Sequence, residues 1–151
     1  MKLFRGVEQR LQYVRTLHDV HFYNDSASTS PEASIVAISQ FNPRKLILLM
    51  GGSSKNADFE GLAKMIVDKG VRVYLYGHEG KRIRDSIVEA GGQNLVLAMD
   101  EGGDFKKIFE GAIQRAMPED SIVLSPACAS FDMFKNSKER GYQFDEIVRN
   151  L

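Results

Sequence analysis

The sequence predicts a single α/β domain in which a doubly wound, mostly parallel sheet of about six strands carries helices on both faces. Short apolar runs alternate with longer segments of helical pattern, which is typical of parallel α/β sheets. Four of the short runs are almost continuous in Ile, Val, Leu, Tyr or Met, as expected for strands buried on both faces. A chain of 151 residues is long enough to form one such domain with a sizeable core.

The predicted strands are apolar segments that are bounded by turn residues or by helical patterns. Five of them cover residues 21–23, 45–50, 71–76, 94–98 and 121–124. A further strand over residues 11–16 is expected at one edge of the sheet.

Helical patterns follow the strands, and several of them carry recognisable ends. They cover residues 31–40, 58–69, 79–90, 104–117 and 131–151. Ser30 is the expected N-cap of the first helix, and Pro31 occupies its first turn. Gly70 ends the second helix. The last pattern is interrupted near Gly141, which leaves it as one helix or two. This order of elements predicts a Rossmann-like fold. We expect residues 1–151 to form a single domain.

Composition excludes several classes of function. Lys and Arg together number 20, as do Asp and Glu, so the net charge is zero and nothing indicates binding to nucleic acid. No apolar run approaches the roughly 20 residues of a membrane span, and the first residues lack the apolar core of a signal peptide. One cysteine, Cys128, cannot form a disulfide within the chain, so we expect a cytoplasmic protein. No His, Cys or Asp cluster has the spacing of metal ligands.

The segment after the first predicted buried strand combines one carboxylate with four hydroxyls. Asp25 is followed by Ser26, Ser28, Thr29 and Ser30, and the next helix begins at once. A helix N-terminus favours anions because its N–H groups are unpaired and its dipole is positive. From the spacing alone, simple capping of the helix by these hydroxyls is the favoured explanation.

Two further segments follow strands in the same way. Residues 51–58 begin with two glycines and contain Lys55, a combination that suits a carboxylate or phosphate site but also a plain tight turn. Residues 125–132 begin with six small residues, which allow close approach of a ligand, and Ser130 is placed to cap the next helix. Cys128 is more consistent with a buried, inert side chain than with a nucleophile. His78 is interpreted as a surface turn residue.

All three segments leave the same edge of the predicted sheet, where open α/β sheets bind their ligands. We therefore expect a pocket rich in hydroxyl and N–H groups with one lysine, suited to a small anion such as an amino acid. Asp25 and Asp132 could serve there as acid and base, although aspartate is also common in turns.

These loops also carry a family resemblance. Residues 4–14, 21–31, 51–59, 124–136 and 140–144 resemble, in order, the C-terminal glutamate ligase domain of UDP-N-acetylmuramoyl-L-alanine:D-glutamate ligases, the MurD type of Mur ligase. The run Ser-Pro-Ala-Cys-Ala-Ser at residues 125–130 is the most specific part.

The resemblance implies a three-domain, ATP-dependent ligase of peptidoglycan biosynthesis. In such enzymes the first domain binds the UDP-sugar substrate, and the central domain carries the P-loop, Mg²⁺ and most of the ATP site. The third binds D-glutamate, whose amine attacks an acyl phosphate formed from ATP. This chain has no Walker A motif, so we expect it to be the third domain of a longer ligase and to be inactive by itself.

The resemblance also assigns binding residues by motif. Thr29, Lys55 and Ser130 would hold the carboxylates of D-glutamate, Arg10 would reach the nucleotide phosphates, and Asp25 the ribose side of ATP. No catalytic residue is assigned. The chain departs from the family pattern at three positions. Family members often have histidine where this chain has Gln9 and lysine where it has Ala27, and they can have an aromatic residue where it has Ser137.

Two other functions remain compatible with the sequence. The chain could be a free-standing module that binds an acidic amino acid or a nucleotide. It could also belong to a related ligase for another amino acid, of the folylpolyglutamate or muropeptide type. The run at residues 125–130 favours the D-glutamate branch.

Overall fold

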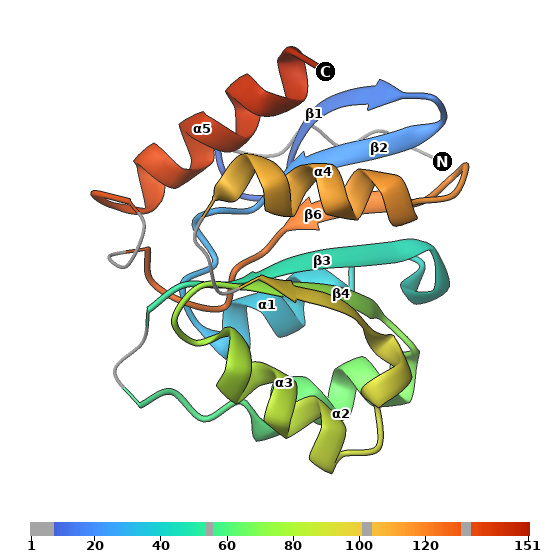
Figure 1. Ribbon diagram of the computed structural model, residues 1–151, viewed down its shortest axis with the longest axis vertical. Coiled ribbons are helices and arrows are strands. Elements are labelled where there is room, and N and C mark those ends of the chain that lie inside the picture. Colours follow the sequence, from blue (N-terminus) through green and yellow to red (C-terminus); the bar gives the residue numbers. More distant parts are fainter. Residues whose placement is uncertain (1–7, 54–55, 101–103, 131–133) are drawn as a thin grey trace.

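A central six-stranded sheet organises the part of the chain that the computed structural model describes, residues 8–53, 56–100, 104–130 and 134–151 (Figure 1). The strands are β1 (Gln12–Leu17), β2 (Val20–Asn24), β3 (Leu46–Gly51), β4 (Arg72–Tyr76), β5 (Val96–Asp100) and β6 (Ser121–Leu124). Their order is β1-β2-β6-β3-β4-β5. Only the edge pair β1–β2 is antiparallel among these strands. The predicted mostly parallel sheet, including its edge strand, is confirmed.

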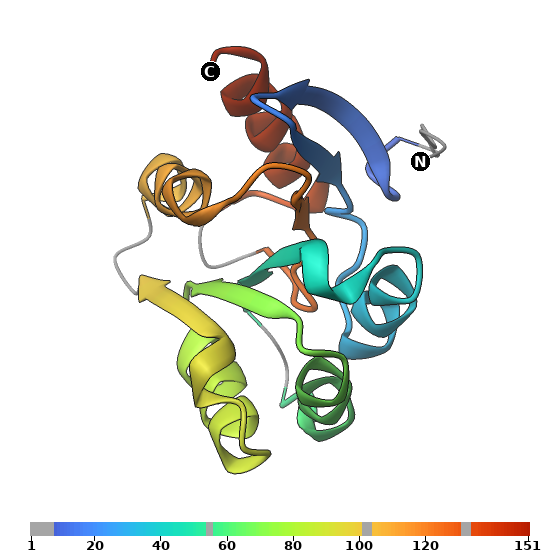
Figure 2. The same ribbon diagram turned by 90° about the vertical axis from the view of Figure 1, so that its right-hand side faces the viewer.

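Helices cover both faces of this sheet (Figures 1 and 2). The described helices are α1 (Pro31–Ile38), α2 (Glu60–Lys69), α3 (Gly80–Glu89), α4 (Phe105–Arg115) and α5 (Ser137–Arg149), with short 3-10 helices η1 (Pro43–Lys45) and η2 (Gln93–Leu95). The Ser30 side chain accepts the Ala33 N–H at 3.3 Å, and Gly70 ends α2 in the left-handed conformation, as predicted. Within the described ranges, each helix is too short or too polar to cross a bilayer.

Burial of the central strands on both faces explains their nearly continuous apolar sequence. In β3, Leu46, Leu48 and Met50 pack with α1, α2 and α3 on one face. Ile47 and Leu49 point to the opposite face and pack in the cluster that includes α4 and α5. All five side chains are fully buried, so neither face requires a polar alternation.

Helix α5 runs through Gly141 without a break, so the predicted interruption there is wrong. A Cβ at this position would overlap the side-chain amide of Gln9. The glycine therefore serves close packing against the segment before β1. Glycine in a helix costs about 0.5–1 kcal/mol, and the packing of Phe144 and Val148 into the core outweighs that cost.

The position of β6 creates a change of direction in the chain. β6 is inserted between β2 and β3, although it follows both in sequence. After β2 and β3 the chain leads to helices on one face, and after β6 it leads to α5 on the other. Such a switch point opens a crevice beyond the carboxyl ends of the strands.

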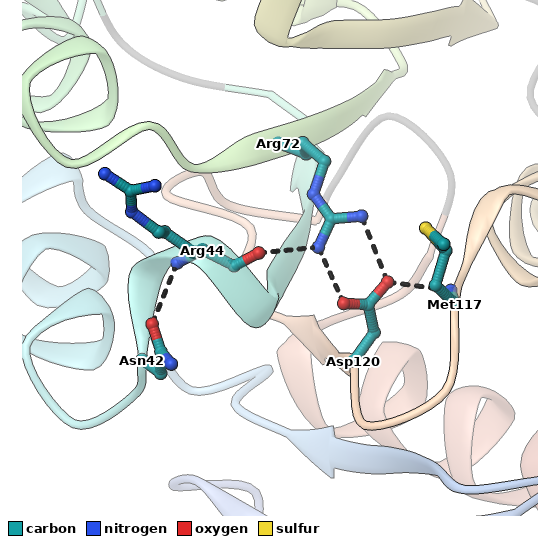
Figure 3. Close-up of polar contacts among 5 residues, drawn as sticks. All are labelled: Asn42, Arg44, Arg72, Met117 and Asp120. Carbon is teal, nitrogen blue, oxygen red and sulfur yellow. Dashed lines mark hydrogen bonds and ion pairs between the residues drawn. The ribbon is translucent and has the colours of Figure 1, made fainter.

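The amino ends of the same strands are held by an ion pair (Figure 3). Arg72, which begins β4, donates from both terminal nitrogens to Asp120, just before β6, at 2.8 and 3.0 Å. Arg72 also donates to the Arg44 carbonyl in η1, and the Met117 N–H donates to Asp120. Burial raises the pKa of Asp120, but the hydrogen bonds from Arg72 and Met117, together with nearby positive charge, outweigh it and leave the pKa below its ordinary value.

Replacing Asp120 with asparagine is expected to lower the free energy of unfolding at neutral pH by about 2 kcal/mol, the scale of a charge-assisted hydrogen bond. A depressed folded-state pKa gives stability that is present above the unfolded value of about 3.9 and is lost as pH falls through the folded value. The difference in the free energy of unfolding between wild type and Asp120→Asn should therefore disappear at acidic pH. Urea unfolding across pH measures it, with Asp68→Asn on the exposed surface of α2 as control. A gap that stayed constant with pH would contradict this role.

Candidate functional site

The three predicted loops meet at the carboxyl ends of β2, β6 and β3. The Asp25 N–H donates to the Leu124 carbonyl at 2.8 Å, which joins the ends of β2 and β6. The Ala127 N–H donates to the Ser28 carbonyl at 3.0 Å, and the Ser53 N–H donates to the Ala129 carbonyl at 2.9 Å. The loop after β6 therefore contacts the other two loops through its backbone.

The glycine pair after β3 allows this close approach. Gly52 has φ +132, a conformation that side chains rarely adopt. A Cβ on Gly52 would overlap the Ala129 carbonyl oxygen, and one on Gly51 would overlap the Tyr76 carbonyl oxygen. Glycine is therefore needed at both positions for the loop after β3 to pack this closely against its neighbours.

Asp25 lies at the centre of the polar network that links the loops. It is only 4% exposed, and its Oδ2 accepts hydrogen bonds from Ser28 Oγ at 2.5 Å and Ser125 Oγ at 2.8 Å. Its Oδ1 accepts the Leu11 N–H at 3.1 Å. Burial raises the pKa of Asp25 above its ordinary value, although these hydrogen bonds and the charge of Arg10 act in the opposite direction.

Arg10 and Asp25 line one surface pocket of about 290 Å³. Ser28 adds a hydroxyl, and the rest of the lining is apolar, from Leu11, Ala33, Val36 and Ala37. Val36 is 61% exposed, so its side chain is available to a ligand at this pocket. The structure thus brings the two residues predicted to bind a nucleotide together, beside an apolar wall.

The three residues predicted to bind the amino acid are placed differently. Thr29 is exposed on the turn that precedes α1. Ser130 is 1% exposed, and its hydroxyl has no hydrogen-bond partner among the described residues. A buried polar group without a partner is costly, so a ligand that supplied one would be favoured there. Lys55 and Asp132 lie outside the described residues.

Capping accounts for only part of the loop chemistry. Ser30 caps α1, as the simpler interpretation of that loop predicts. Asp25, Ser28 and Ser125 instead bond to one another across two loops. Cys128 is fully buried, in agreement with its predicted structural role, and His78 is exposed.

Sequence reasoning missed a set of α5 residues behind the loops. Arg140 is fully buried and donates hydrogen bonds to Ser26 and to the Cys128 carbonyl. Asn24 donates from Nδ2 to the Gly141 carbonyl and to Asp145, both at 2.9 Å. Arg140 stands in a polar stretch of sequence that is typical of a solvated helix face. The only available signal was the resemblance over residues 140–144.

Comparisons with known proteins show the family of this chain. The family model "Mur ligase, glutamate ligase domain" matches residues 9–128. UDP-N-acetylmuramoylalanine–D-glutamate ligases from Caldicellulosiruptor saccharolyticus and Natranaerobius thermophilus are 39% and 40% identical to this chain over its whole length, and the match covers 32% of each. The enzyme of the same name from Acinetobacter baylyi is 40% identical, with 34% of its length covered. The chain therefore spans about a third of the curated relatives that it matches.

Solved structures show the same fold at lower identity. The bifunctional folylpolyglutamate synthase/dihydrofolate synthase of Yersinia pestis matches 96% of this chain with a TM-score of 0.60 and 14% identity, over 31% of its own length. The MurF ligase of Thermotoga maritima, solved in complex with ADP, matches 97% with a TM-score of 0.58 and 20% identity, over 33% of its length. These likenesses confirm the Rossmann-like α/β architecture.

Proposed function

This chain belongs to the Mur ligase glutamate ligase domain family, and from that membership we propose that it is the amino-acid-binding domain of an ATP-dependent ligase that adds D-glutamate to UDP-N-acetylmuramoyl-L-alanine. The observation that carries the proposal is that relatives named for this reaction match the whole chain at about 40% identity. A ligase for another amino acid is less well supported, because the folylpolyglutamate and MurF structures share only the fold.

The proposed amino-acid site uses Thr29, Lys55 and Ser130. D-glutamate carries two carboxylates, which a cation and hydroxyl donors bind well. The buried Ser130 hydroxyl supports this assignment, since it has no partner among the described residues and could donate to a carboxylate. Thr29 would donate from the neighbouring loop, and Lys55 would supply the positive charge.

The proposed nucleotide contact uses the pocket that Arg10 and Asp25 line. An arginine suits phosphate oxygens, and a carboxylate suits ribose hydroxyls. A carboxylate has about four lone-pair sites, and three hydrogen bonds from Ser28, Ser125 and Leu11 leave room for a further donor. The apolar wall around Val36 would contact the remainder of the nucleoside. In this proposal, Mg²⁺ and most of the ATP site belong to the central domain of the full-length ligase.

Replacing Lys55 with alanine in the full-length ligase is expected to raise the apparent KM for D-glutamate about tenfold or more, the loss expected of one charge-assisted hydrogen bond. Ser130→Ala should act in the same direction, and the KM for ATP should change far less in both. Lys64→Ala, which removes an exposed lysine paired with Glu60 on α2, is the matched control. An unchanged KM for D-glutamate in Lys55→Ala would remove the assignment of this lysine.

The ligase reaction itself can be separated from simple binding. Phosphate release that requires ATP, UDP-N-acetylmuramoyl-L-alanine and D-glutamate together supports the proposal. D-glutamate binding by the full-length protein without any turnover would favour the alternative of a binding module. The chain alone should not hydrolyse ATP, because it lacks a Walker A motif.

A further inference from the structure

We propose that Arg140 is a positioning residue for the ligase reaction, because its buried guanidinium fixes the loop that carries Asp25 and Thr29 against the loop that carries Ser130. The inference rests on the proposed function. It assigns to α5 the task of holding the nucleotide side and the amino-acid side of the site in one fixed arrangement.

The hydrogen bonds of Arg140 connect the two loops directly. Nε donates to Ser26 Oγ at 3.0 Å, and Nη2 donates to the Ser26 carbonyl at 2.8 Å. Nη1 donates to the Cys128 carbonyl at 3.0 Å. Ser26 directly follows Asp25, and Cys128 lies two residues before Ser130. One rigid side-chain plane therefore adds a second link between the two binding segments, beside their direct hydrogen bonds.

The chemistry of arginine is required for this bridge. A buried guanidinium is costly unless its donors are satisfied, so its presence at 0% exposure depends on the loop acceptors. The planar fork holds several acceptors at fixed angles, whereas a lysine ammonium is a single point at the end of a flexible chain. Ser26 Oγ passes the connection on by donating to the Ser137 carbonyl at 2.7 Å, at the start of α5.

Other contacts hold α5 on the sheet independently of Arg140. Asn24 donates to the Gly141 carbonyl and to Asp145, and Gln9 Nε2 donates to the Lys138 carbonyl at 3.0 Å. Phe144 is buried in the core. Loss of the guanidinium should therefore leave α5 docked. The two loops would keep the Ala127–Ser28 and Ser125–Asp25 hydrogen bonds between them, but their relative position would be less tightly fixed.

Such movement would affect both substrates. In the proposed reaction the amine of D-glutamate must meet an acyl phosphate that is formed from ATP, and small errors in such an alignment cost large factors in rate. Asp25 belongs to the nucleotide side and Ser130 to the amino-acid side. A residue that fixes their separation should change the apparent KM of both substrates together.

The test compares Arg140→Met and Arg140→Lys with Arg72→Met in the full-length ligase. Arg72 is a matched control because it also donates to residues of two other segments, but at the amino ends of the strands (Figure 3). Arg140→Met should raise the apparent KM for D-glutamate and for ATP at least about fivefold each, and Arg140→Lys should resemble it. Arg72→Met should lower Tm and leave both KM values unchanged.

Each outcome decides the question. If Arg140→Met lowers Tm but leaves both KM values at the wild-type level, the residue is merely structural and the inference is overturned. A change in the KM of only one substrate also overturns the inference, because Arg140 would then position only one of the two loops. If Arg140→Met does not fold, Arg140→Lys decides by the same two criteria. A wild-type ligase that does not use D-glutamate would instead refute the proposed function, and this inference with it.

Discussion

Replacing Gly52 with alanine is expected to lower the free energy of unfolding of this chain by about 3 kcal/mol. A side chain at φ +132 carries strain of about 1–3 kcal/mol. The new Cβ would also overlap the Ala129 carbonyl oxygen, and a backbone atom cannot rotate away. The hydrogen bond from the Ser53 N–H to this carbonyl would be weakened as well, at a cost of about 1 kcal/mol.

The matched control for Gly52→Ala is Gly61→Ala. Gly61 lies in α2, and a Cβ there would meet no atom within 4 Å. Alanine is favoured over glycine in helices by up to about 1 kcal/mol, so this variant should be as stable as wild type or slightly more stable. Urea unfolding of the two variants and the wild-type chain measures the difference. Equal stability of Gly52→Ala and wild type would show that the β3 and β6 loops do not need their close approach.

Replacing Asp25 with alanine is expected to produce the second large loss, about 2–4 kcal/mol. The substitution would leave the Leu11 N–H and the hydroxyls of Ser28 and Ser125 without their shared acceptor. Each buried donor that is left unsatisfied costs about 1–3 kcal/mol, and the hydroxyls can partly reorient. Because Leu11 adjoins Arg10, the same change should disturb the pocket and raise the KM for ATP in the full-length ligase.

Asp25→Asn separates the charge of this residue from its shape. The pKa of Asp25 is raised mainly by burial, so ionisation of the folded protein opposes folding. The stability that accompanies a raised pKa is fully present below the unfolded value of about 3.9 and is lost as pH rises through the folded value. Asparagine carries no charge at any pH, so the Asp25→Asn variant does not lose that stability as pH rises.

Asp25→Asn should therefore gain stability relative to wild type as pH rises from about 3.9 toward neutrality, while its KM for ATP in the full-length ligase still increases. Urea unfolding across pH, combined with steady-state kinetics, measures both effects. A stability difference that did not vary with pH would show that the carboxyl is not held in a desolvated state. An unchanged KM for ATP would argue against its proposed contact with the ribose.

Local sequence signals predicted the elements of this fold well. Strands such as Leu46–Gly51 are buried on both faces, so their apolar runs stand out without any knowledge of their neighbours. Ser30 and Pro31 begin α1 and Gly70 ends α2 by local backbone chemistry. The position of candidate site residues after strands was equally predictable, because parallel strands place their carboxyl ends at one edge.

Long-range packing was not predictable from the same signals. Nothing in Ser121–Leu124 indicates that this strand lies between β2 and β3, since an apolar run does not specify its partners. Gly141 read as a helix break because its contact with Gln9 comes from a distant segment. No local signal marked Arg140 as buried, because the acceptors that satisfy it belong to loops more than ten residues away.

The central place of β6 has a consequence for how the protein is made. His21 pairs with Ser121 across about a hundred residues of sequence, whereas β3 and β4 are linked by one short helical connection. Contacts between distant segments form slowly, because the entropy of closing the loop must be overcome first. During synthesis, β3, β4 and β5 can assemble with α2 and α3 while the edge of β3 that later pairs with β6 is still unpaired. The loops after β2 and β3 can contact the loop after β6 only once β6 has been synthesised and has inserted between β2 and β3, and the contacts of Arg140 follow when α5 docks.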